Sequence, residues 1–303
     1  MLFTILIELF SPDFLLRNAL YATLLLAAVA PLAGCFLLMR RAAFLGVALP
    51  QVSAAGLCGG WLLLEFNGVC STTAAASGQA GLVNSAWCLL AAFGAALAAL
   101  LALAWLERGG GSPDARHGAL YVLAGAGTVL LLVYHPHADS IYQGIFRGEV
   151  VSVGRGDLQL SAISLLPAGG LLLFFRHEFL WAGADFSFWA VSGRNAMFWN
   201  AALLMLIGVV VSTGVFVAGP MVCLGVVLLP AFAAHILARR MWHFFLLAST
   251  FGVVGGLAGF AFAYARDWPA GSSVVAADGL LLVFAAFARA VLRWFVPAGR
   301  VRG

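Results

Sequence analysis

A short stretch near the N-terminus, residues 39–56, places polar side chains and a proline inside an apolar segment. Pro50 removes a backbone hydrogen-bond donor and disfavours helix at the residue before it, which predicts a broken span. In lipid a freed carbonyl needs a partner in protein or water, so such a break is typical of a helix that lines a passage. Gly46, Gln51 and Ser53 flank the break and could supply flexibility and polarity. A kinked but ordinary span with two tolerated polar residues is the alternative.

A cluster of three ionisable residues and one aspartate inside an apolar run could also bind or carry ions. His135, His137 and Asp139 lie close together in the sequence, and two imidazoles with a carboxylate can hold a divalent metal. Pro136 prevents helical placement of the two histidines, so an incidental surface cluster is the alternative. Asp278 lies inside the last apolar run, where charge is costly and usually functional. It predicts either an ion-coupled site or a carboxylate that is paired with a neighbouring donor.

The composition indicates what must position these residues. Of 303 residues, 63% are hydrophobic and only 9% are charged, whereas soluble domains carry about 25% charged residues. The chain is therefore predicted to be an all-α, polytopic integral membrane protein. Its basic residues are all arginine, and the net charge of +4 is better explained by membrane topology than by affinity for nucleic acid. No nucleic-acid partner is expected.

Nine apolar runs predict about nine transmembrane helices. Because only residues 218–220 separate the sixth run from the seventh, eight or ten spans are alternatives. With Arg40–Arg41 in the cytoplasm, alternation leaves only Arg17, Arg147, Arg155 and Arg266 of the arginines outside. The excess inside predicts an outer N-terminus and a cytoplasmic C-terminus. The runs are 14–39, 43–66, 86–106, 118–134, 158–175, 197–217, 219–238, 241–265 and 272–293.

The chain has no lysine and hence no phosphate-binding P-loop, so any ATP-driven transport needs another subunit. One cytoplasmic loop, residues 176–196, could bind such a partner. Asp185 can cap a short helix and Gly193 can end it. Its apolar side chains need a cover, which could be another protein or the lipid headgroups. These side chains are Phe186, Phe188 and Trp189.

Five segments in order resemble the permease subunit of bacterial zinc and manganese ABC importers, the metal ABC permease or ABC-3 family. The resemblance runs from about Asp13 to Val275. The segments that resemble the family are 13–20 with Gly34 and the arginine pair, 148–158, 185–193, 217–231 and 267–275. The family resemblance implies a single transmembrane permease domain over residues 1–303.

The opening stretch departs from the family pattern. The family has Gly-Asp-x-x-x-His after the arginine pair, with the acid and the imidazole near the metal. Here Val47 and Gln51 occupy those positions. Valine has no donor atom and an amide oxygen is a weak ligand, so the family's intramembrane metal site is not carried over. The predicted substrate pathway is Gly46, Val47, Pro50, Gln51 and Ser53.

The resemblance implies a bacterial inner-membrane homodimer that works by alternating access. A separate ATPase, which binds ATP and Mg, would dock on Asp185, Phe186, Phe188, Trp189 and Gly193. A periplasmic or lipid-anchored binding protein would deliver the substrate to Gly148, Glu149 and Asp157. The chain itself would hold no cofactor and no catalytic residue.

Three functions are compatible with the sequence. The first is a permease for zinc or manganese, and the sequence does not choose the metal. The second is a permease of the same fold for a metal chelate or another small nutrient, which the exchange at Val47 and Gln51 favours. The third is an integral membrane enzyme, which would need clustered His, Asp or Glu within the spans, and the runs contain few such residues.

Overall fold

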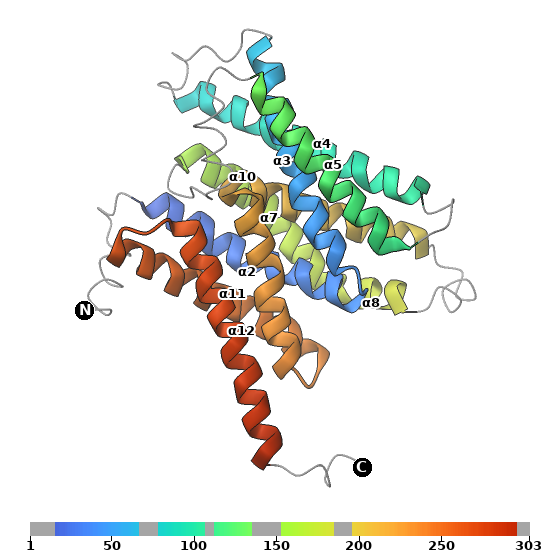
Figure 1. Cartoon of the computed structure of the whole chain (residues 1–303), viewed down its shortest axis with the longest axis vertical. Helices are drawn as coiled ribbons and strands as arrows, with labels where there is room; N and C mark the ends of the chain where they lie inside the picture. Colours follow the sequence, from blue (N-terminus) through green and yellow to red (C-terminus); the bar gives the residue numbers. More distant parts are fainter. Residues whose placement is uncertain (1–15, 67–77, 107–111, 135–152, 185–195, 296–303) are drawn as a thin grey trace.

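The computed structural model describes residues 16–66, 78–106, 112–134, 153–184 and 196–295. In these ranges the chain forms α-helices joined by short connections, without strands (Figure 1). The all-α, polytopic prediction is therefore confirmed. The helices are α2 (Arg17–Met39), α3 (Ala43–Phe66), α4 (Gly78–Leu106), α5 (Pro113–Val133), α7 (Arg155–Phe174), α8 (Arg176–Ala184), α10 (Ala196–Leu237), α11 (Met241–Arg266) and α12 (Ala270–Phe295).

Eight of these helices are long and apolar enough to cross a membrane, all except α8. Their bounds follow the predicted runs closely, although α4 begins earlier than residue 86 and α5 begins before 118. The start of α5 follows from local chemistry. The Ser112 hydroxyl accepts a hydrogen bond from the Ala115 N–H, and Pro113 occupies the first turn, where its missing donor costs nothing.

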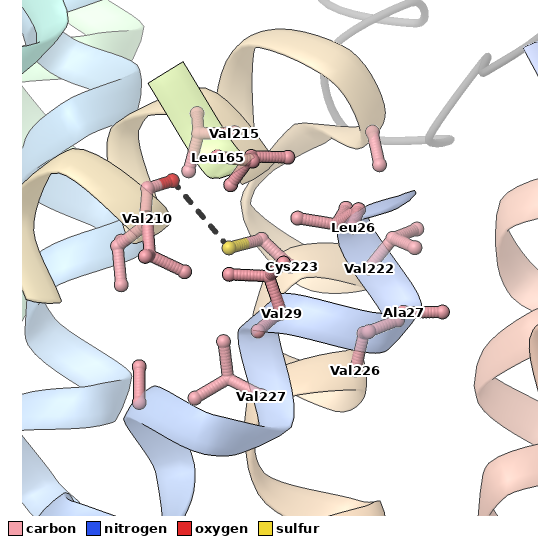
Figure 2. Packing of buried hydrophobic residues seen from close by; sticks show 14 of the residues in the cluster. Leu26, Ala27, Val29, Leu165, Val210, Val215, Val222, Cys223, Val226 and Val227 are labelled. Atoms are coloured by element: carbon pink, nitrogen blue, oxygen red, sulfur yellow. Dashed lines mark hydrogen bonds between the residues drawn. The ribbon is translucent and has the colours of Figure 1, made fainter. Parts of the chain in front are cut away.

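The predicted sixth and seventh spans form one element, α10, which folds back on itself. Gly219 has non-helical angles (φ 80°, ψ 166°) and precedes Pro220. The Cys223 thiol lies 3.5 Å from the Val211 carbonyl oxygen, to which it donates (Figure 2). In one straight helix these residues would stand about 18 Å apart along the axis. The element is therefore two antiparallel arms, 196–218 and 220–237.

Both ends of α10 lie at one face of the molecule. Asn200 near its start accepts a hydrogen bond from Arg40 at the end of α2. His235 near its end packs on Phe244 at the start of α11, with ring centroids 5.5 Å apart. Each arm is roughly 27–35 Å long, which is enough to cross the hydrocarbon core. Counted by arms, the eight long helices contain nine membrane-length segments.

The centre of the core is α2, which packs against α10, α11 and α7. In the membrane-length apolar stretch of α2, 72% of the residues are buried inside the protein, compared with 11% in the same stretch of α5. Figure 2 shows Leu26, Ala27 and Val29 of α2 interlocked with Val222 and Cys223 of the second arm of α10. By contrast, α5 and α12 expose large apolar side chains outward, as expected for surfaces that meet lipid or another subunit.

Two glycine pairs in α11 let three helices approach closely. Gly252 and Gly256 face Ala27 of α2, whereas Gly255 and Gly259 face α12. A Cβ added at Gly259 would lie 2.7 Å from the Ser273 carbonyl oxygen. Small residues at i and i+4 allow backbone contact between membrane helices. Helix α11 is therefore held between α2 and α12 by two separate stripes of small residues.

Candidate functional site

The predicted break in the second span is wrong. Helix α3 runs without interruption from Ala43 to Phe66 with Pro50 inside it. The proline still removes the hydrogen bond that its N–H would donate to Gly46. Packing of α3 against α4, α5 and α10 keeps the helix continuous. The real break among the described helices is at Gly219 of α10, where the backbone adopts angles that side chains disfavour.

The five predicted pathway residues divide between two faces of α3. Gly46, Pro50 and Ser53 recur at helical spacing on a buried face. A Cβ at Gly46 would meet Leu37 of α2 and Leu228 of α10. Val47 and Gln51 lie one turn apart on a half-buried face. The structure therefore does not bring all five to one surface.

Gln51 lies against α5. A Cβ added at Gly125 of α5 would stand 3.4 Å from the Gln51 amide nitrogen and 3.8 Å from its Cγ. The glycine leaves the space that this polar side chain occupies between the two helices. An amide in this position can donate and accept hydrogen bonds but carries no charge. The α3 face formed by Val47 and Gln51 can therefore bind a cation only through neutral oxygen.

A row of hydroxyl groups connects three helices beside this face. Ser53 of α3 lies 3.2 Å from Ser212 of α10, oxygen to oxygen. The next residue, Thr213, lies 2.8 Å from Ser164 of α7 and also donates to the Val209 carbonyl at 2.8 Å. Interhelical hydroxyl contacts in a membrane each contribute about 0.6 kcal/mol. These four hydroxyl residues, Ser53, Ser212, Thr213 and Ser164, form a polar seam that connects α3, α10 and α7.

The sequence reasoning included Ser53 but missed its partners. The available signal was a Ser212–Thr213 pair in the middle of an otherwise apolar run. A single polar residue in a span is often satisfied by its own helix, so the pair alone did not show which helix it faces. Among the described residues no group of three His, Cys, Asp or Glu side chains is close enough to hold a metal ion.

Asp278 is placed as the sequence predicted, facing the interior. Its side chain is fully buried in α12, and its carboxyl oxygen occupies the space beside Gly255 of α11. Neither carboxyl oxygen has a hydrogen-bond partner among the described residues. The predicted pairing with a neighbouring donor is therefore not seen. An unpartnered buried polar group lowers stability.

We expect Asp278→Ala to stabilise the folded chain by about 1–3 kcal/mol, because the substitution removes a buried group without partners. Thermal unfolding in detergent, followed with a thiol-reactive dye, measures this, since Cys35, Cys58, Cys88 and Cys223 are buried. Ala276→Ser, on the same helix, is the comparison for a small polar change. A lower midpoint for Asp278→Ala would show that the carboxyl makes a stabilising contact.

Several predicted site residues lie outside the described ranges. These are His135, His137, Asp139, Gly148, Glu149, Asp185, Phe186, Phe188, Trp189 and Gly193. Asp157 is described. Its carboxylate accepts a hydrogen bond from the Gly154 N–H at 3.1 Å and so caps the start of α7.

The predicted cytoplasmic loop 176–196 begins with a helix that the sequence reasoning did not predict. Helix α8 buries Phe179 and exposes His177 and Trp181. The Arg176 guanidinium lies 4.3 Å from the centre of the Trp242 ring at the start of α11. This cation–π contact fixes α8 against the ends of the long helices. Helix α8 therefore connects the start of this loop to the helical core.

A model of the ABC 3 transport family matches residues 13–289. This chain belongs to that family. The family resemblance seen in the sequence is confirmed, and so is the prediction that the chain is a multi-pass membrane protein. The family comprises membrane subunits of transporters, which confirms that this ABC-3 permease is a transport subunit without an ATPase site of its own.

Relatives of the permease are distant. The manganese transport system membrane protein MntC of Listeria innocua is 25% identical over 48% of this chain and 52% of the relative. In that alignment the chain spans only about half of the relative's length. The zinc transport system membrane protein TroC of Treponema pallidum is 27% identical over 84% of this chain and 81% of the relative. These relatives are named for different metals.

A solved structure shares the fold. It is PsaBC from Streptococcus pneumoniae in complex with Fab, with a TM-score of 0.77 and 19% identity. The match covers 97% of this chain and 100% of the other. At this identity the similarity supports the fold alone. The described helices of the permease therefore share the arrangement of the helices in that structure.

Proposed function

We propose that this permease carries a divalent metal ion, manganese or zinc, into a bacterial cell. The observation that carries this proposal is the family match over residues 13–289, together with relatives named for manganese and for zinc transport. On the half-buried face of α3 the Gln51 amide offers a neutral oxygen ligand, separate from the buried hydroxyl contacts of Ser53. Such ligands suit manganese better than zinc, which prefers nitrogen and sulfur.

The complex that we propose has two copies of this chain, two ATPase subunits and a binding protein. ATP and Mg would bind the ATPase subunits. The ATPase would act on α8, at the end of the molecule that we assign to the cytoplasm because Arg40–Arg41 and Arg239–Arg240 gather there. The N-terminus would then lie outside and the C-terminus inside. The binding protein would meet the opposite face of the bacterial inner membrane.

A second candidate is a permease for a metal chelate or another small nutrient. The observation that favours it is the pair Val47 and Gln51, which supplies neither an acid nor an imidazole to the half-buried face of α3. A cation that arrives inside a chelate needs no anionic ligand from the pore. The two candidates differ in whether the free ion is transported.

Reconstituted vesicles separate the candidates. We expect ATP-dependent uptake of radioactive manganese or zinc when the permease is assembled with its ATPase and binding protein. Gln51→Ala should lower this uptake roughly tenfold, because losing one polar contact of about 1.4 kcal/mol has that effect. Gln159→Ala makes the same change at an exposed position of α7 and should leave uptake unchanged.

Val47→Asp provides a gain-of-function comparison, because it adds an anionic oxygen one turn before Gln51. We expect it to change the preference between manganese and zinc. If neither metal accumulates while the binding protein still stimulates ATP hydrolysis, the chain is a working importer for another substrate. That result would favour the second candidate.

A further inference from the structure

One half-buried arginine joins three helices at the face assigned to the cytoplasm. Arg40 ends α2, and its guanidinium donates one hydrogen bond to the Asn200 side-chain oxygen at the start of α10. It donates a second, of 3.3 Å, to the Phe179 carbonyl oxygen in the middle of α8. The two acceptor residues, Phe179 and Asn200, are 139 and 160 positions from Arg40 in the sequence. No other described arginine bridges α8 and α10 in this way.

Aromatic rings surround this arginine contact. Phe179 of α8 is 2% exposed and lies 5.8 Å from Phe36 of α2, between ring centroids, with the rings almost perpendicular. The Phe179 ring also lies 5.8 Å from Trp199 of α10. Phe36 in turn contacts Phe245 of α11 at 5.0 Å. The Arg40 hydrogen bonds therefore cross a packed contact into which α8 inserts the Phe179 ring, in addition to the Arg176 contact with Trp242.

Holding a guanidinium in this contact is costly. Arg40 is half-buried, and its Nε has no hydrogen-bond partner among the described residues. Burial lowers the pKa of Arg40 from its ordinary value, yet an arginine stays charged. Replacing buried charges by apolar groups is often neutral or stabilising, so stability alone gives a weak reason for arginine here. A planar fork that reaches two acceptors at once gives a stronger reason, because it fixes their relative positions.

Arg41 provides a contrast within the same pair. Its side chain is exposed, and its backbone is left-handed with φ of 55°. The positive charges of both arginines favour the cytoplasmic side equally, but only the Arg40 side chain enters the contact between the helices. Topology therefore explains why the pair is basic, but it does not explain why Arg40 faces inward.

We propose that Arg40 is a positioning residue that couples α8 to the ends of α2 and α10. When a partner displaces α8, the two hydrogen bonds make α2 and the first arm of α10 move with it. Those helices carry the core and the Ser212–Thr213 seam, so their movement reaches α3, the helix of Val47 and Gln51, through Ser53. The proposal rests on the proposed function only in taking an ATPase as the partner that moves α8.

The test compares Arg40→Met with Arg41→Met, which remove the same charge from adjacent positions. In the complex with the ATPase and the binding protein, we expect Arg40→Met to keep basal ATP hydrolysis. Its stimulation by the binding protein should fall by at least about fivefold, and uptake per ATP should fall with it. Arg41→Met should behave like the unmodified protein. Asn200→Leu, which removes one acceptor, should give an intermediate value, and Arg40→Lys should restore only part of the stimulation.

A second readout does not need the ATPase. A nitroxide pair at exposed His177 on α8 and Phe44 on α3 reports how firmly α8 is held. We expect the distance distribution to broaden in Arg40→Met and to stay narrow in Arg41→Met. Equal stimulation and equal distributions in the two variants would overturn the proposal. If no ATPase is stimulated even by the unmodified chain, the proposed function fails, and the distance distributions still decide the role of Arg40.

Discussion

Gly252→Ala should destabilise the folded permease by about 1–3 kcal/mol or more, although alanine is the better helix former. A Cβ at this position would overlap the Ala27 carbonyl oxygen of α2 and lie 2.8 Å from Pro31 Cγ. Backbone atoms of two packed helices cannot move aside singly, so α11 and α2 must separate. Contacts along the whole central helix would weaken.

The same argument applies to Gly34, whose added Cβ would overlap the Val227 carbonyl oxygen of α10. Gly94→Ala is the matched control, because no atom lies within 4 Å of the Cβ that it would add on α4. Thermal unfolding in detergent with a thiol-reactive dye should show midpoints several degrees lower for the two core variants and unchanged for Gly94→Ala. A midpoint for Gly252→Ala equal to the control would contradict the close approach of α2 and α11.

Gly219→Ala should produce a second large loss, for a conformational reason. With φ of 80° and ψ of 166°, Gly219 occupies a region that is essentially restricted to glycine. Forcing another residue into it costs about 1–3 kcal/mol. Pro220 follows directly and cannot adopt many alternatives, so the strain is not easily relieved. The two arms of α10 would splay, and the Cys223 contact with Val211 would open.

Gly208→Ala on the first arm is the control for this experiment. Its Cβ would lie 3.6 Å from Phe93, an ordinary van der Waals distance. We expect Gly208→Ala to match or exceed the stability of the unmodified chain, since glycine is unfavourable inside a helix. The reactivity of Cys223 toward a small thiol reagent should rise only in Gly219→Ala. Unchanged reactivity and stability in that variant would show that the fold does not depend on this angle.

The sequence contained enough information to predict the class of protein and most helix positions. Runs of apolar residues of membrane length are unambiguous, because lipid requires every backbone hydrogen bond to be made within the helix. Arginine placement predicted which helix ends share a face, and the structure brings Arg40 and Arg176 near that face. The family motifs then predicted the transporter family, which the match over 13–289 confirms.

The sequence reasoning was less successful with local irregularities. Proline suggested a break at Pro50, yet α3 is continuous there, while α10 folds back at Gly219 next to another proline. Both sites contain a proline, so the residue type alone does not distinguish them. Whether a helix bends or breaks depends on what packs around it, because neighbouring helices can satisfy the freed backbone and hold the axis straight.

Helical spacing by itself determined that Val47 and Gln51 share one face of α3, and the types of residue determined that this face is uncharged. Only the tertiary structure decided which helix each face meets: Gln51 lies beside Gly125, Ser53 meets Ser212, and Arg40 reaches Phe179 and Asn200. The physical reason is that periodicity is a property of one helix, set by its own backbone. Contacts between helices depend on the fit of small and large side chains that lie far apart in the sequence, and that fit is defined only when the helices have packed.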